Sequence, residues 1–185
     1  MKKQTVTYLI WLVIVVAWVA GLSFGRWGPA NKTFFGELGR AVGIPGPSSL
    51  EWWQPLLYFP LTVVAVFVVS ELLFGAVAPL FIFARGVWDS VLFSQLETSI
   101  QGLDITAVTG GTIWMIFFYI LVFVGNLPLC LWASHLGIER SIRNLERLRG
   151  KPLRPEEGLV SGLILLVVIS VILGLMAAFA VSYGG

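Results

Sequence analysis

Long apolar stretches alternate with polar segments along this chain. The stretches cover residues 5–24, 55–74, 79–96, 113–136 and 157–182. A helix of about 20 apolar residues crosses a bilayer, so each stretch suits one crossing. The pattern predicts an all-α fold, a polytopic transmembrane helical bundle forming a single membrane domain over residues 1–185.

The apolar run over residues 55–85 decides the number of spans. At about 31 residues it is too long for one membrane helix and somewhat short for two. Gly75 and Pro79 interrupt it, because glycine is conformationally permissive and proline removes a backbone hydrogen bond. We therefore predict that the chain turns back here and crosses the membrane five times. A four-span bundle is the alternative.

Two further segments have the pattern of amphipathic helices at the membrane surface. Asn31 is a candidate cap for the first, whose apolar face would contain Phe34, Phe35, Leu38 and Val42. The second covers about residues 137–149, where an apolar stripe alternates with basic residues. We expect its basic side chains to contact lipid headgroups. These are Arg140, Arg143, Arg147, Arg149 and Lys151.

The basic residues also predict the orientation in the membrane. Residues 138–157 contain six Lys/Arg, the densest basic cluster of the chain, and the positive-inside rule places them in the cytoplasm. Lys2 and Lys3 favour a cytoplasmic N-terminus. With five spans, the prediction is a multi-pass protein of the cell membrane with an extracytoplasmic C-terminus. The four-span alternative puts the N-terminus outside and residues 26–54 on the opposite side.

Small residues recur every four positions in two of the predicted spans, a spacing that lets helices approach closely. In the first span they are Ala17, Gly21 and Gly25, which we interpret as ordinary packing positions. In the last span we expect a helix-packing face, directed at the chain's own bundle or at a partner chain. It consists of Gly158, Gly162, Ser170, Gly174, Ala178 and Ser182.

Three charged residues fall within the apolar run or just after it, where a charge is costly unless it is paired or functional. These are Glu71, Arg85 and Asp89. If the chain turns back, the depths of Glu71 and Arg85 differ by only about 5 Å, which predicts an ion pair between them. Arg85 and Asp89 also share one helix face, four residues apart. The charges hold the hairpin together, form an ion or proton path, or belong to side chains that extend to the membrane interface.

A second polar set lies in the fourth predicted span and just beyond it. His135 and Glu139 are four residues apart, and histidine titrates near neutral pH, so a proton relay is one interpretation. The other is a histidine at the membrane boundary, exposed to headgroups. For Asn126 we expect a hydrogen bond across helices.

Composition and motifs narrow the functional classes. Hydrophobic residues make up 57% of the chain and charged residues 12%, about half the charged share of a soluble domain. The single histidine and the single cysteine, Cys130, argue against a metal site built from those types, and we expect no cofactor. The sequence has no H-E-x-x-H, G-x-S-x-G or P-loop motif, so we expect no enzyme and no catalytic residues. The net charge of +2 gives no reason to expect nucleic acid.

The order of elements resembles that of the stage II sporulation protein M family. A first span precedes a turn-rich connection, then an apolar run interrupted over residues 75–86, then a span with Gly125-Asn126-Leu-Pro128 and a closing span rich in small residues. Where members show asparagine-glycine after the broken run, this chain has Arg85-Gly86. Where they carry a histidine-glycine-x-x-glutamate-like element, it has the sequence His135-Leu-Gly-Ile-Glu139. The resemblance implies an integral membrane protein without known catalysis.

Together these features predict a non-enzymatic integral membrane protein that acts as a scaffold or assembly subunit of a membrane complex. The expected partners are the lipid bilayer and other membrane chains or further copies of this one. The alternative is a small transporter or channel subunit that uses Glu71, Arg85 and Asp89.

Overall fold

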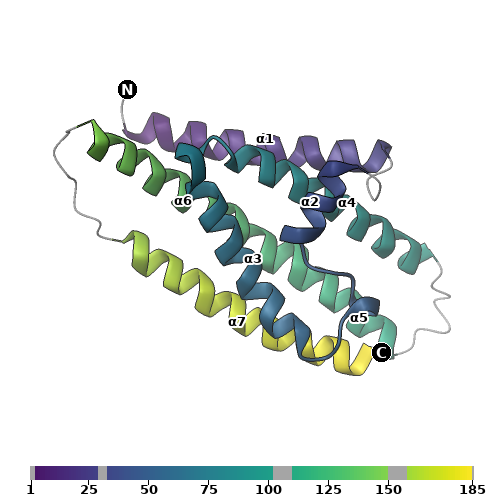
Figure 1. Cartoon of the computed structure of the whole chain (residues 1–185). Coiled ribbons are helices and arrows are strands. Elements are labelled where there is room, and N and C mark those ends of the chain that lie inside the picture. Colours follow the sequence, from purple (N-terminus) through teal and green to yellow (C-terminus); the bar gives the residue numbers. More distant parts are fainter. Residues whose placement is uncertain (1–2, 29–32, 102–109, 150–157, 185) are drawn as a thin grey trace.

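The computed structural model describes residues 3–28, 33–101, 110–149 and 158–184, and nearly all of them are helical (Figure 1). The α-helices are α1 (Lys3–Trp27), α2 (Phe34–Val42), α3 (Gln54–Glu71), α4 (Ala78–Gln101), α5 (Gly110–Ile120), α6 (Leu127–Leu148) and α7 (Leu159–Gly184). Shorter helical segments are η2 (Pro47–Ser49), η3 (Leu72–Gly75) and the π-helical η5 (Leu121–Asn126). These residues contain no strand, so the prediction of an all-α bundle is confirmed.

Within the described residues, four helical segments are long and apolar enough to cross a membrane. They cover Thr5–Trp27, Gln54–Glu71, Gly110–Leu148 and Leu159–Tyr183. Many large apolar side chains of α1 and α7 are exposed, and only 11% of the most apolar part of α1 is buried in the bundle. Such surfaces fit an integral membrane protein, since lipid is the solvent that would cover them. α4 is long enough to cross but carries charged residues.

The chain reverses direction where the sequence predicts a break. α3 ends at Glu71, η3 follows, and α4 begins at Ala78. Gly75 has a positive φ of 80°, a backbone conformation that residues with a side chain rarely adopt. The permissive glycine therefore forms the turn between α3 and α4.

Contacts between side chains give the relative directions of the helices. α1 and α4 run parallel, because Trp18 contacts Asp89 while Arg26, further along α1, contacts Glu97, further along α4. α3 runs parallel to the helix of η5 and α6, because Asn126 bonds to Thr62 while Ser134, eight residues later, bonds to Ser70, eight residues further along α3.

The remaining pairs run antiparallel. On α4, Arg85 meets Asn126 while Ser99 meets Met115, so α4 is antiparallel to the helix that begins with α5. α7 returns along the same helix, with Tyr183 stacked on Trp114 near the start of α5. The bundle thus has α1, α4 and α7 running one way, and α3 and α5–α6 the other (Figure 1).

α5, η5 and α6 form one continuous helix of 39 residues, about 58 Å long. Residues 137–148 are therefore the end of α6 and not the separate surface helix we predicted. The wider turns of η5 lie just before Pro128, and there the Leu127 N–H bonds to the Val122 carbonyl, five residues back. A π-helical turn accommodates proline because the missing N–H falls where the hydrogen-bond pattern has already shifted.

α2 forms near its predicted position but packs differently. Thr33 caps it by accepting a hydrogen bond from the Gly36 N–H at 3.1 Å, while Asn31, the predicted cap, lies outside the described residues. Its buried face contains two glycines and Val42, whereas Phe34 is 70% exposed. A side chain at Gly39 would collide with the backbone of α4, so α2 lies close against α4 through its glycines, and Phe35 packs against Phe83 of α4 with ring centroids 5.1 Å apart.

The last helix confirms a packing face made of small residues, and this face points into the chain's own bundle. Ser170, Gly174 and Ala178 are buried, and Gly174 meets the start of α3, where an added Cβ would lie 2.9 Å from the Pro55 carbonyl oxygen. The ends of the predicted stripe differ. Gly162 is half-buried, Gly158 precedes the helix and is exposed, and Ser182 is also exposed.

The helix predicted over residues 79–96 extends further than expected. α4 continues to Gln101, and α5 begins at Gly110, while residues 102–109 lie outside the described part. The hydroxyls of Thr98 and Ser99 bond to the carbonyls of Ser94 and Gln95, four residues back. Because their hydroxyls find partners inside the helix, these polar residues do not end it.

Candidate functional site

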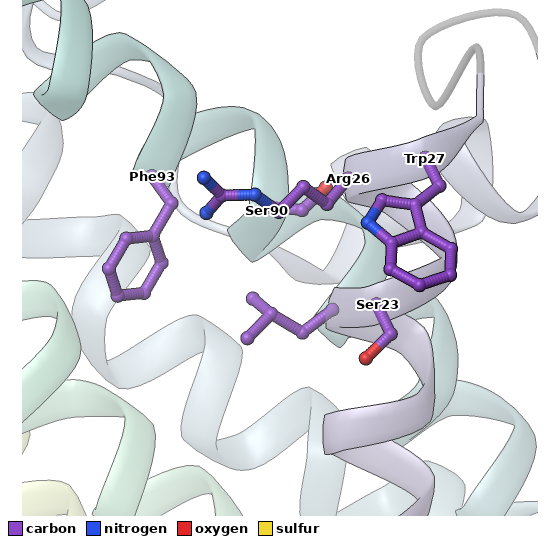
Figure 2. A pocket seen from close by; sticks show the side chains of 6 residues that line it. Ser23, Arg26, Trp27, Ser90 and Phe93 are labelled. Carbon is purple, nitrogen blue, oxygen red and sulfur yellow. The ribbon is translucent and has the colours of Figure 1, made fainter.

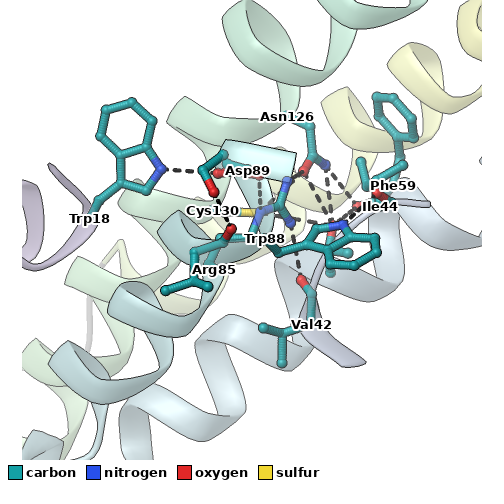
Figure 3. A network of polar contacts seen from close by, with 12 residues as sticks. Trp18, Val42, Ile44, Phe59, Arg85, Trp88, Asp89, Asn126 and Cys130 are labelled. Atoms are coloured by element: carbon teal, nitrogen blue, oxygen red, sulfur yellow. Dashed lines mark hydrogen bonds and ion pairs between the residues drawn. The ribbon is translucent and has the colours of Figure 1, made fainter. Parts of the chain in front are cut away.

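A fully buried ion pair lies inside the bundle on α4 (Figure 3). The Nε of Arg85 donates to Oδ1 of Asp89 at 2.9 Å, and both side chains are 0% exposed. The other carboxylate oxygen, Oδ2, accepts from the indole Nε1 of Trp18 on α1, also at 2.9 Å. Both oxygens of the carboxylate are therefore satisfied, as a buried charge requires.

The guanidinium group of Arg85 reaches two more helices. Its Nη1 donates to the carbonyl oxygen of Val42, the last residue of α2, at 3.0 Å. Its Nη2 lies 3.5 Å from Oδ1 of Asn126. The C-terminal end of a helix carries partial negative charge, so α2 adds to the stabilisation of the cation. One helical turn away, Trp88 Nε1 donates to the Ile44 carbonyl at 2.9 Å and fixes the segment that follows α2.

Asn126 connects this pair to α3. Its Nδ2 donates to the Phe59 carbonyl at 3.1 Å and to Thr62 Oγ1 at 3.2 Å. Its Oδ1 accepts from the thiol of Cys130, one turn along α6, at 3.4 Å. The predicted interhelical role of Asn126 is thus confirmed, and it links α3, α4 and the helix formed by η5 and α6.

We call this set the polar network: Trp18, the Val42 carbonyl, Thr62, Arg85, Asp89, Asn126 and Cys130. Thr62 lies near the middle of α3, about 12 Å from either end. The network therefore sits near mid-depth of the bundle and joins five helices, α1, α2, α3, α4 and α6. Two of the hollows in the described part of the chain flank α4, and neither of these two is lined by Arg85, Asp89 or Asn126.

The predicted pair between Glu71 and Arg85 is wrong. Glu71 Oε1 lies 3.3 Å from Nε of Arg140 and accepts from Asn144 Nδ2 at 3.2 Å. The chain does turn back after Glu71, but α3 packs along α6 whereas α4 packs along α1. Glu71, the last residue of α3, therefore meets the end of α6, and Arg85 finds its partner one turn along its own helix.

Asn126 lies apart from the other two members of the second polar set, His135 and Glu139. Asn126 belongs to the polar network, and His135 lies nine residues further along, about 13 Å away. The His135 ring stacks on Trp11 of α1, with centroids 5.1 Å apart, and its buried Nε2 has no hydrogen-bond partner in the structure. Glu139 instead pairs with Arg143 at 2.7 Å.

Among the basic residues expected at headgroups, Arg140 and Arg143 form ion pairs with carboxylates of the protein. Arg140 pairs with Glu71 and lies over the Phe67 ring, 5.8 Å from its centroid, and Arg143 pairs with Glu139. Arg147 and Arg149 are exposed at the end of α6, while Lys151 lies outside the described residues. Contact with lipid headgroups remains a prediction for these side chains.

Sequence reasoning missed Trp18, Thr62 and the Val42 carbonyl as members of the network. Thr62 gave a usable signal, because it is a lone hydroxyl in the middle of an apolar span. Trp18 gave a weaker one, since a buried indole N–H usually finds a hydrogen-bond partner. The backbone carbonyl of Val42 left no trace in the residue pattern.

Neither a metal-ligand cluster nor a known relative adds a chemistry to the polar network. Within the described residues no three His, Cys, Asp or Glu side chains come together in a way that could hold a metal ion. The function therefore has to be inferred from the contacts of the polar network itself. Comparison of the chain with protein family models, curated proteins and solved structures finds no match.

Proposed function

We propose that this protein is a non-enzymatic integral membrane protein that serves as a scaffold or assembly subunit of a membrane complex. The observation that carries the proposal is the closed polar network. Charged side chains that move ions or protons usually face a water-filled cavity. Arg85 and Asp89 are instead fully buried and bonded to neighbouring helices, which supports a structural role. Membership of the stage II sporulation protein M family is part of the same proposal.

The proposal includes five membrane crossings with a cytoplasmic N-terminus. If two helices both span the membrane and run in the same direction, the chain must cross back through the membrane between them. α3 and α6 run parallel, and α4 is the long helix between them in the chain. The pairing of the α4 charges within the bundle removes the main cost of placing that helix in lipid. In the four-span alternative α3 and α6 would run in opposite directions.

Single cysteines test this topology. In a Cys130→Ala background, Ser48→Cys reports on the exposed segment before α3, and Arg149→Cys on the exposed end of α6. Five crossings predict that a membrane-impermeant thiol reagent labels these two positions from opposite sides of sealed vesicles. Labelling of both from the same side would exclude the five-span arrangement and support four.

Two measurements test the function. Proteoliposomes holding the wild type, Arg85→Met or Glu71→Gln should show the same flux of protons, K⁺ and Na⁺ as empty liposomes, with lower thermal stability for Arg85→Met. Flux that disappears in Arg85→Met while folding is retained would support the transporter class instead. For the assembly role, light scattering after mild extraction from source membranes should give a protein mass well above the 20.3 kDa of one chain. A mass equal to one chain would refute it.

A further inference from the structure

A hollow of about 260 Å³ lies between the last turns of α1 and the middle of α4 (Figure 2). Four of its lining residues come from α1 and two from α4: Leu22, Ser23, Arg26, Trp27, Ser90 and Phe93. Its surface is mostly apolar, and Phe93 is held in place by Phe123, with ring centroids 4.3 Å apart. The hollow is partly open, and the exposed side chains of Arg26 and Trp27 form its rim.

The rim has the residue types found where acyl chains meet headgroups. Trp27 is 90% exposed, and it follows Arg26 as the last residue of a candidate membrane span. Indole rings favour this interface, and arginine extends its charged end toward it while its stem stays in lipid. The hollow therefore opens at the depth of the glycerol and phosphate groups of the bilayer.

An exposed apolar stripe continues from the hollow along the same face of α1. Leu12, Val15 and Val19 are 60%, 42% and 46% exposed, and their spacing of three and four residues places them on the face of Leu22. From Leu12 to Leu22 the stripe is about 15 Å long, close to half the thickness of a bilayer's hydrocarbon core. An extended acyl chain of one leaflet fits this length.

Two opposite charges stand side by side at the top of the stripe. Arg26 Nη2 lies 3.0 Å from Oε1 of Glu97, with side chains 58% and 48% exposed. Glu97 occupies one of five guanidinium N–H groups, which leaves donors for a phosphate. A headgroup with negative charge alone would meet repulsion from the carboxylate, whereas a phosphate with a tethered ammonium complements both charges.

We infer that this hollow binds a zwitterionic phospholipid of the phosphatidylethanolamine type. Its phosphate contacts Arg26, its ammonium contacts Glu97, and one acyl chain lies in the hollow and along the apolar stripe of α1.

Native mass spectrometry of the delipidated full-length protein in an uncharged detergent tests this. The protein is titrated with phosphatidylethanolamine, phosphatidylglycerol and diacylglycerol of identical chains. We expect phosphatidylethanolamine to bind most tightly and Arg26→Gln to weaken its binding about tenfold, because a charge-assisted phosphate contact is lost. Ser23→Trp, at an exposed rim position, should also weaken it by filling the hollow. Glu97→Gln should shift the preference toward phosphatidylglycerol.

Arg40→Gln is the matched control, since Arg40 is an exposed arginine of α2 that does not line the hollow. It should bind phosphatidylethanolamine like the wild type. Equal binding of the three lipids, tighter binding of phosphatidylglycerol by the wild type, or equal losses in Arg26→Gln and Arg40→Gln would each overturn the inference. Circular dichroism of every variant verifies its helical content. If Arg26→Gln fails to fold, loss of binding in Ser23→Trp still tests the inference, because Ser23 is exposed and its substitution should not disturb the bundle.

Discussion

Removing one charge of the buried pair should be at least as damaging as removing both. Asp89→Asn leaves the Arg85 guanidinium buried without a compensating charge, and Arg85→Met does the same to the carboxylate. Breaking a buried pair from one side costs about 3–5 kcal/mol of unfolding free energy. Independent losses would add to about 6–10 kcal/mol in the double variant.

The double variant, Arg85→Met with Asp89→Asn, carries no unpaired charge. What it loses is the donor to the Val42 carbonyl and to Asn126, and one buried acceptor without a partner costs about 1–3 kcal/mol. The double variant should therefore be at least as stable as either single variant. The assay is equilibrium unfolding in mixed micelles, followed by tryptophan fluorescence and circular dichroism.

A matched control comes from a second ion pair with the same spacing on a helix. Glu139 and Arg143 also lie four residues apart, at 2.7 Å, but their side chains are 30% and 21% exposed. Solvent screens such a pair, so Glu139→Gln should cost only about 0.3–0.5 kcal/mol. Strictly additive losses in the Arg85/Asp89 double variant, or a cost for Asp89→Asn no larger than for Glu139→Gln, would refute the reasoning.

Three further predictions concern packing and the exposed end of α3. Gly174→Ala should lower the unfolding free energy by about 1–3 kcal/mol because its Cβ would approach the backbone of α3. In the same unfolding assay Gly162→Ala should be neutral or stabilising, because its Cβ would lie 3.4 Å from the flexible side chain of Leu136. Gly86→Ala should likewise loosen α1 from α4, seen as faster proteolysis of α1, while Gly110→Ala, with open space around it, should leave the cleavage rate unchanged. Glu71→Gln should lower the unfolding free energy by no more than about 1 kcal/mol, since its pair with the end of α6 is partly exposed; a loss comparable to that of Asp89→Asn would contradict this.

The apolar pattern was sufficient to predict the helices and the reversal after Glu71. Hydrophobic length and helix-breaking residues are local properties, so the bounds of α3 and α4 fall within a few residues of the expected ones. The stripe of small residues on α7 was also readable, because close approach of two backbones requires small side chains at regular spacing.

The partners of the charged residues were not readable in the same way. Depth along a hairpin placed Glu71 near Arg85, but depth says nothing about which side of a helix faces which neighbour. The neighbours of α3 are set by its packing against α6 and α7. This packing is a property of the whole bundle. The position of α2 could not be predicted from the local pattern either. Its glycines allow it to pack closely beside α4, which brings the Val42 carbonyl to Arg85.

The lone cysteine offers the most direct test of a closed polar network. The thiol of Cys130 is fully buried and lies 3.4 Å from Oδ1 of Asn126, so it reports on water beside Arg85 without any substitution. With the protein in membranes, a small charged thiol reagent should leave Cys130 unmodified for as long as the fold persists, while Ser48→Cys, at an exposed position, is labelled rapidly. Labelling of Cys130 in the folded wild type at a rate near that of Ser48→Cys would show a water-filled path to the buried pair and contradict its structural role.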